Sequence, residues 1–115
     1  MKKIEAFVRS ERFSMVRDRL RELGIGGIIT SVSGWTKGRE LHMGYRALPV
    51  SRDLIAGAKF ELFVPDDMID LVVKTITETA RTGKLGDGVI AVSNLEKIIN
   101  ITTLEDGGKS FSPQP

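Results

Sequence analysis

Residues 58–92 read AKFELFVPDDMIDLVVKTITETARTGKLGDGVIAV, and the order of the patterns within them decides the fold. Residues 58–64 alternate between apolar and polar side chains, which predicts a half-buried strand. The Pro-Asp-Asp sequence at 65–67 predicts an N-terminal cap, because acidic side chains there favour the first turn of a helix. Apolar residues then recur at helical spacing to about residue 81. This part of the chain therefore predicts a strand followed directly by an amphipathic helix.

A glycine-rich loop, residues 82–88, follows this helix and precedes a further strand at 89–92. Gly83, Gly86 and Gly88 permit positive φ and a close approach of the backbone to a ligand. Consecutive amide groups could then point at phosphate oxygens, although the spacing is not that of a Walker loop and no helix follows. Taken alone, the residues leave two interpretations open: a phosphate cradle, or an ordinary turn between a helix and a strand.

The N-terminal part of the chain adds a strand, a helix and a second strand. Alternation predicts a strand over 3–8, and apolar spacing predicts a helix over 14–23 that Ser14 caps and Gly24 ends. Residues 28–32 have the character of a strand. The complete order predicts an α+β protein, a ferredoxin-like βαββαβ sandwich with both helices on one face of an antiparallel sheet.

The other face of such a sheet also needs cover. The sequence contains no third layer and no cysteine for disulfides, so another copy of the chain would bury that face best, which predicts an oligomer. We expect one domain over residues 1–106, with a short helical turn and a last strand within 96–101. Residues 107–115 have the composition of a mobile tail.

The composition is that of a soluble globular protein, with 41% hydrophobic and 28% charged residues. The 17 Lys and Arg and 15 Asp and Glu are spread without runs of like charge, so no nucleic-acid partner is expected. The sequence contains neither a secretory leader nor an apolar stretch of about 20 residues, which favours the cytoplasm. With no cysteine, one histidine and no carboxylate pair beside a base, we expect neither catalytic nor metal-ligating residues.

Residues 33–57 contain a long segment without sustained periodicity. Loops longer than about 12–15 residues in a compact domain are usually functional or disordered, so this segment is the first place to look for partner contacts. Its candidate contact residues are Trp35, Lys37, Arg39, His42, Tyr45 and Arg46. Two have simpler interpretations, since Trp35 could anchor the loop to the domain and a lone histidine is usually an ordinary loop residue.

Three features together resemble the PII nitrogen-regulatory family: MKKIEA at the N-terminus, ARTGKLGDG at 80–88, and the Tyr45-Arg46 pair. The likeness extends over about residues 1–105. It implies a homotrimer of ferredoxin-like signalling subunits that bind an adenine nucleotide in the clefts between them. It also implies that 33–57 is the T-loop, which docks on a membrane transporter, enzyme or regulator, and that 82–88 is the B-loop.

The resemblance further implies a nucleotide site, matched position by position. The matched members are Phe7, Gly34, Glu61, Val64, Gly86, Asp87 and Gly88, and the neighbouring loop and strand residues Gly83, Lys84 and Val89 complete the predicted site. The family typically has three phosphate-binding cations where this chain has Val89, Asn100 and Thr102. Since charge-assisted hydrogen bonds contribute about 1.5–3 kcal/mol each, ADP, AMP or a cyclic nucleotide is expected as the effector rather than ATP. No cofactor is required, and a need for magnesium stays open.

The expected loop departs from the family as well. Gly38 and Gly57 stand where members that sense 2-oxoglutarate have a magnesium-binding Gln and a Lys, and no residue matches the modified Tyr or Ser of other members. We therefore expect a divergent PII-like protein with a different input. The alternatives are a role in bicarbonate or metal transport, and a trimeric interaction module that binds no ligand.

Overall fold

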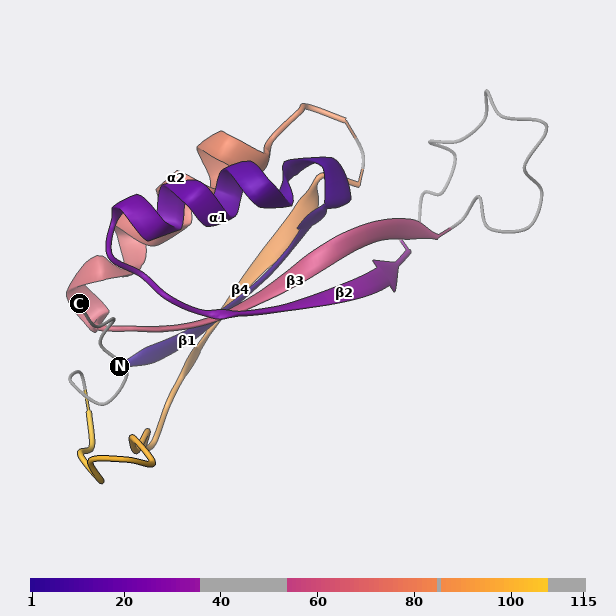
Figure 1. The fold of residues 1–115 in the computed structure, drawn as a ribbon. Helices are drawn as coiled ribbons and strands as arrows, with labels where there is room; N and C mark the ends of the chain where they lie inside the picture. Colours follow the sequence, from indigo (N-terminus) through magenta and orange to yellow (C-terminus); the bar gives the residue numbers. More distant parts are fainter. Residues whose placement is uncertain (36–53, 85, 108–115) are drawn as a thin grey trace.

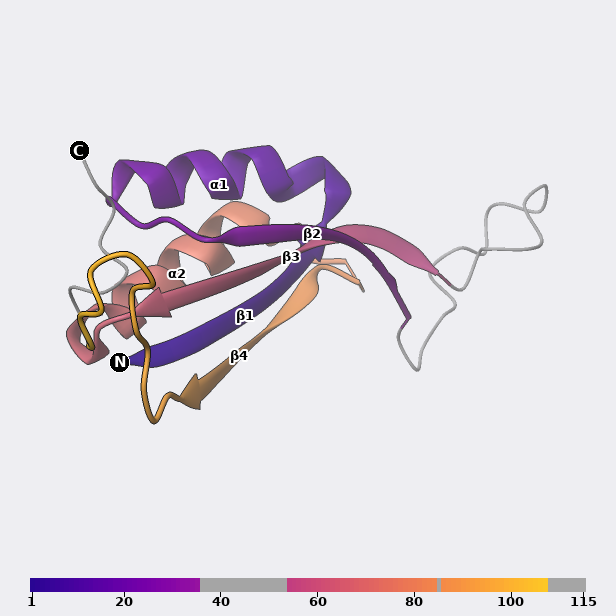
Figure 2. The ribbon, with the colours of Figure 1, turned by 60° about the horizontal axis from the view of Figure 1, so that its bottom comes forward.

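The computed structural model describes residues 1–35, 54–84 and 86–107 of the 115-residue chain. The main elements are β1 (Lys2–Arg9), α1 (Phe13–Glu22), β2 (Ile28–Gly34), β3 (Ile55–Val64), α2 (Ile69–Ala80) and β4 (Gly88–Asn94). The strands form one antiparallel sheet in the order β2-β3-β1-β4. Both helices lie on the same face of this sheet (Figure 1), and the turned view in Figure 2 shows the same two layers. The predicted ferredoxin-like α+β fold is confirmed.

The core lies between the two helices and the facing side of β1 and β3. Ile4, Ala6 and Val8 of β1 pair in register with Leu62, Phe60 and Ala58 of β3, and all six are buried. The two helices contribute Val16, Leu20, Val72, Ile76 and Ala80 to the same cluster. The period-two and helical patterns in the sequence thus identify the buried faces correctly.

The opposite face of the sheet carries an ion-pair network. Glu5 and Glu61 stand directly opposite each other on β1 and β3, an arrangement that repulsion would disfavour on its own. Lys3 offsets it, since its Nζ lies 3.2 Å from a Glu61 carboxylate oxygen and 3.6 Å from one of Glu5. The hydrogen bond to Glu61 and the charge of Glu5 raise the pKa of Lys3. Phe7 and Phe63 are half-buried on this open face, which is therefore mixed in character rather than uniformly apolar.

Strands β2 and β3 are longer than their sequence patterns predicted. Ser33 pairs with Ala56 and Gly34 with Ile55, so both strands continue into the segment expected to be loop. Small and polar residues hide the period-two pattern there, and backbone pairing decides the structure instead. Residues 36–53, which include most of the expected T-loop, lie outside the described part of the chain.

Neither predicted helix cap is confirmed. Ser14 lies inside α1, whose N-cap is Arg12, and no side chain caps this end. Asp66 belongs to a 3₁₀ turn before α2 and forms an ion pair with the N-terminal ammonium at 3.0 Å. The predicted C-terminal end of the first helix is correct, since Gly24 follows α1 with φ of +78°.

The segment after β4 does not form the last strand that the sequence pattern suggested within residues 96–101. A single bridge joins Ile99 to Asp106, and the Asn100 side-chain oxygen accepts the amide N–H of Thr102 at 2.8 Å and that of Thr103 at 3.0 Å. These bonds close a turn where the sequence had suggested a strand. Residues 108–115, most of the predicted tail, lie outside the described residues.

Candidate functional site

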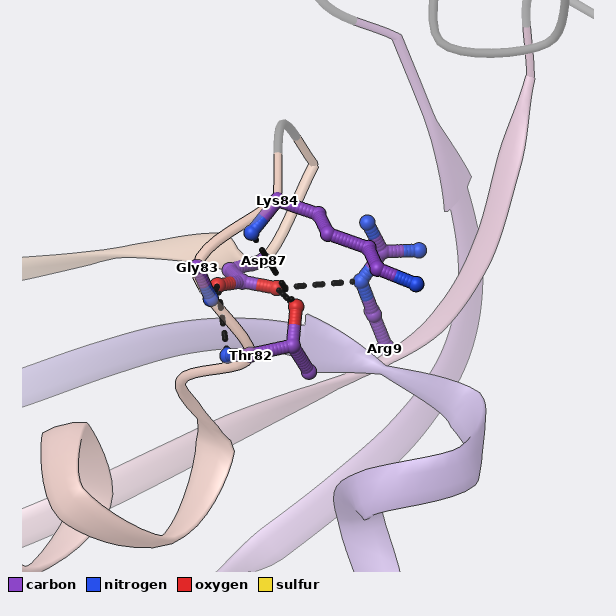
Figure 3. A network of polar contacts seen from close by, with 5 residues as sticks. All are labelled: Arg9, Thr82, Gly83, Lys84 and Asp87. Atoms are coloured by element: carbon purple, nitrogen blue, oxygen red, sulfur yellow. Dashed lines mark hydrogen bonds and ion pairs between the residues drawn. The ribbon is translucent and has the colours of Figure 1, made fainter.

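The glycine-rich loop between α2 and β4 is held by one carboxylate (Figure 3). Asp87 Oδ2 accepts the amide N–H of Thr82 at 2.7 Å and that of Gly83 at 2.8 Å. Its Oδ1 accepts the Thr82 hydroxyl and the Nε–H of Arg9, the latter at 3.1 Å. The amide of Lys84 donates to the Thr82 hydroxyl oxygen at 3.2 Å. Asp87 thus fastens both ends of the loop to each other and to the end of β1.

The ionisation of Asp87 depends on these contacts. Partial burial of the carboxyl opposes its ionisation, but the hydrogen bonds from Thr82, Gly83 and Arg9 outweigh that cost. Together they hold the pKa of Asp87 well below its usual range. The carboxylate is therefore charged at neutral pH and organises the loop, which is a different role from direct contact with a ligand.

Three glycines give the loop its shape. Gly83, Gly86 and Gly88 have φ of +88°, +88° and +130°, so the predicted positive φ values are confirmed. At Gly88 the constraint is also steric, because a Cβ there would lie 1.9 Å from the carbonyl oxygen of Phe7. The close approach of β4 to β1 at this point requires glycine.

A cavity of about 340 Å³ lies beside this loop. Its lining residues are Phe7, Gly34, Trp35, Ile55, Gly86, Gly88 and Val89. Five of them, all but Trp35 and Ile55, are members of the nucleotide site that the sequence predicted, and they come from β1, the end of β2, the loop and β4. Trp35, predicted as a partner contact, is 75% exposed. The fold therefore brings half of the predicted nucleotide site together around one apolar cavity.

The other predicted nucleotide-site residues lie elsewhere or have other roles. Glu61 is paired with Lys3 on the open face of the sheet. The side chain of Val64 is fully buried on the helix face, so it cannot contact a ligand. Gly83 and Lys84 belong to the network around Asp87. Among the predicted partner residues, Lys37, Arg39, His42, Tyr45 and Arg46 lie outside the described residues.

Two site residues were missed by the sequence analysis. Ile55 lines the cavity because β3 begins earlier than its alternation suggested. Arg9 reaches the loop from the end of β1, and only the tertiary pairing of β1 with β4 reveals it. Among the residues that the structure describes, no three His, Asp or Glu side chains gather as metal ligands. The described helices are also too short or too polar to cross a membrane.

The fold and the cavity define a class, a ferredoxin-like α+β subunit with a glycine-rich loop beside a small apolar pocket. A family model described as nitrogen regulatory protein P-II matches residues 1–105. The chain is 39% identical over 107 residues to the nitrogen regulatory protein P-II of Haemophilus influenzae, and equally to P-II 1 of Escherichia coli K12. Each comparison covers 92% of this chain and 96% of the relative.

Solved structures agree with these relatives. Arabidopsis thaliana PII bound to citrate superimposes with a TM-score of 0.77 and 32% identity, covering 99% of this chain and 92% of that one. The chain belongs to the P-II family of nitrogen regulatory proteins. Members of this family are regulatory signalling proteins, so the chain is a regulatory protein rather than an enzyme.

Proposed function

We propose that this protein binds an adenine nucleotide with few phosphates in the cavity beside the glycine-rich loop. The observation that carries the proposal is the convergence of Phe7, Gly34, Gly86, Gly88 and Val89 on one pocket. An apolar pocket with aromatic side chains suits a planar base, and the glycines beside it let the backbone approach a phosphate closely. Bound nucleotide then acts as the signal that the protein reports to a partner.

The preference for few phosphates rests on charge. Among the residues that line the cavity, none carries a charged side chain. Val89 is 69% exposed at the rim of the cavity and is apolar. The side-chain oxygen of Asn100 accepts a backbone hydrogen bond in the turn after β4. The cations on the loop side are Arg9, already engaged by Asp87, and Lys84, whose side chain runs towards Arg9 in Figure 3. Arg81 lines an adjoining pocket with Asp87, Gly88 and Val89. A triphosphate in the cavity would therefore find no cation among the residues that line it.

Trp35 connects the cavity to the partner-binding segment. It lines the cavity and directly precedes residues 36–53. A nucleotide base packed against this ring would restrict the conformations of Trp35 and of the residues that follow it. This restriction would change how the segment docks on a transporter or enzyme, so the partner would respond to bound nucleotide. The proposal leaves nitrogen, inorganic carbon and metal transport as candidate pathways for that partner.

Titration with ATP, ADP, AMP and cyclic AMP tests the nucleotide proposal. We expect AMP, ADP or cyclic AMP to bind at least as tightly as ATP, measured by calorimetry. Trp35 is the only tryptophan, so its fluorescence reports occupancy of this cavity directly. Neither heat nor a fluorescence change with any of the four nucleotides would refute nucleotide sensing and favour the interaction module without ligand.

A charge substitution sharpens that test. Val89→Lys places a cation at the rim of the cavity and is expected to tighten ATP binding about tenfold, with less effect on AMP. Ser93→Lys is the matched control, because Ser93 is exposed on the same strand and face but does not line the cavity. Equal gains from both variants would mean that net charge, rather than the site, controls affinity.

We propose that the protein acts as a homotrimer of domains spanning 1–106, with 82–88 as B-loop, 33–57 as T-loop and 107–115 as a mobile tail. The open sheet face, with half-buried Phe7 and Phe63 beside its ion pairs, supports burial against other copies. Light scattering at micromolar concentration is expected to give three times the 12.7 kDa mass of one chain. A monomer under these conditions would contradict the trimer.

A further inference from the structure

A second pocket lies on the helix side of the sheet, between α1 and the start of β2. Its volume is about 290 Å³, and it shares no lining residue with the cavity beside the glycine-rich loop. The lining residues are Arg17, Leu20, Arg21, Ile25, Gly26, Gly27, Ile29, Phe60 and Leu62. Leu20, Phe60 and Leu62 belong to the buried core, so the floor of the pocket is apolar and firmly packed.

The rim of this pocket is cationic. Arg17 and Arg21 are four residues apart on α1, a spacing that places both on one side of the helix. The Arg17 guanidinium lies over the Phe13 ring, 5.5 Å from its centre, and its Nε is 3.3 Å from Asp18. Among the described residues no acidic side chain pairs with Arg21, while the remaining α1 acid, Glu22, lies 3.9 Å from Arg19. The pocket therefore offers about one unbalanced positive charge above an apolar floor.

We propose that this pocket binds a small monocarboxylic acid with an apolar body. The guanidinium of Arg21 can hold a carboxylate through two parallel hydrogen bonds, and Arg17, fixed by Phe13, adds to the attraction. The apolar body would lie against Ile25 and Ile29, which also line the pocket and keep part of their surface exposed above the buried core. Such a ligand would give the protein an input that is separate from the nucleotide cavity.

Gly26 provides a way to block the pocket without disturbing the fold. It lines the pocket, and a Cβ added there would meet no atom within 4 Å. Gly26→Val would therefore place a side chain in open space, whereas the neighbouring Gly27 has no room, since a Cβ there lies 2.4 Å from Leu62 Cδ2. Gly26→Val and Arg21→Gln thus remove the space and the charge separately.

Octanoate is the probe, with 1-octanol as the neutral analogue, in an NMR titration of the ¹⁵N-labelled full chain. We expect saturating shifts of the Gly26, Gly27 and Ile29 amides with octanoate and much smaller ones with octanol. Arg21→Gln should weaken octanoate binding about tenfold or more, and Gly26→Val should weaken it comparably. Arg19→Gln, on the same helix but outside the pocket, should leave it unchanged.

Several results would overturn the proposal. These are the absence of saturating shifts in wild-type protein, equal shifts with octanol, or equal losses in Arg19→Gln and Arg21→Gln. Thermal unfolding of each variant shows whether it is folded. If Arg21→Gln is stable and still loses octanoate binding, the loss results from the changed pocket and not from unfolding. Because the nucleotide cavity shares no residue with this pocket, nucleotide binding should survive in both pocket variants.

Discussion

Gly88→Ala is expected to lower the free energy of unfolding by about 3 kcal/mol or more. The new Cβ would lie 1.9 Å from the carbonyl oxygen of Phe7 and 3.0 Å from its carbonyl carbon. Both atoms belong to the backbone of β1, which is one of the two inner strands and is paired with β3 on its other side. The clash can be relieved only by separating β4 from β1, and urea unfolding followed by circular dichroism measures the loss.

Gly83→Ala separates this clash from backbone strain. Gly83 lies in the same loop with φ of +88°, but a Cβ there would meet no atom within 4 Å. Only the left-handed conformation is then penalised, at about 1–2 kcal/mol. If the two variants lost equal stability, crowding against β1 could not be the reason that Gly88 is required.

Asp87→Asn is expected to be the second most damaging single substitution in the loop, at about 2–3 kcal/mol. The amide keeps the shape of the carboxylate, but it loses the charge that binds Arg9 and one of the acceptor positions that hold Thr82 and Gly83. The loop should open at both ends as a result. Weaker nucleotide binding should accompany the loss, because Gly86 and Gly88 would no longer be held beside the cavity.

The pH dependence of unfolding tests whether the negative charge of Asp87 causes the stability difference between wild type and Asp87→Asn. The pKa of Asp87 is depressed in the folded protein, so its contribution is fully present above the unfolded pKa and is lost as pH falls through the folded value. The stability gap between wild type and Asp87→Asn should therefore be constant above about pH 5 and shrink below about pH 4. Asp67→Asn, which changes an exposed carboxylate in the 3₁₀ turn before α2, is the control for replacing an acid by an amide.

The fold could be predicted from the sequence because the strongest patterns of apolar and polar residues are local. Alternation in β1 and β3 and the helical stripe of α2 identify the buried faces without knowledge of the tertiary structure. The glycines of the loop likewise identify its positive φ positions, since few other residues adopt them. These features depend on residues close together in the chain.

The parts that the sequence did not predict depend on distant pairing. Arg9 and Asp87 are far apart in sequence, and only the register of β1 with β4 brings them to 3.1 Å. Position-by-position matching to a family placed Val64 in the site, yet its side chain faces the helices. The bonds of the Asp87 carboxylate to Thr82, Gly83 and Arg9 were likewise absent from the sequence prediction, which expected Asp87 only as a nucleotide contact.

The inner position of β1, between β3 and β4, has a consequence for folding kinetics. Its two neighbours, β3 and β4, are the third and fourth strands of the chain, so every pairing that β1 makes is non-local. During synthesis its apolar side chains Ile4 and Val8 stay exposed until β3 and α2 have left the ribosome. We therefore expect slow, late formation of the sheet, with substitutions in β1 affecting the folding rate as well as the final stability.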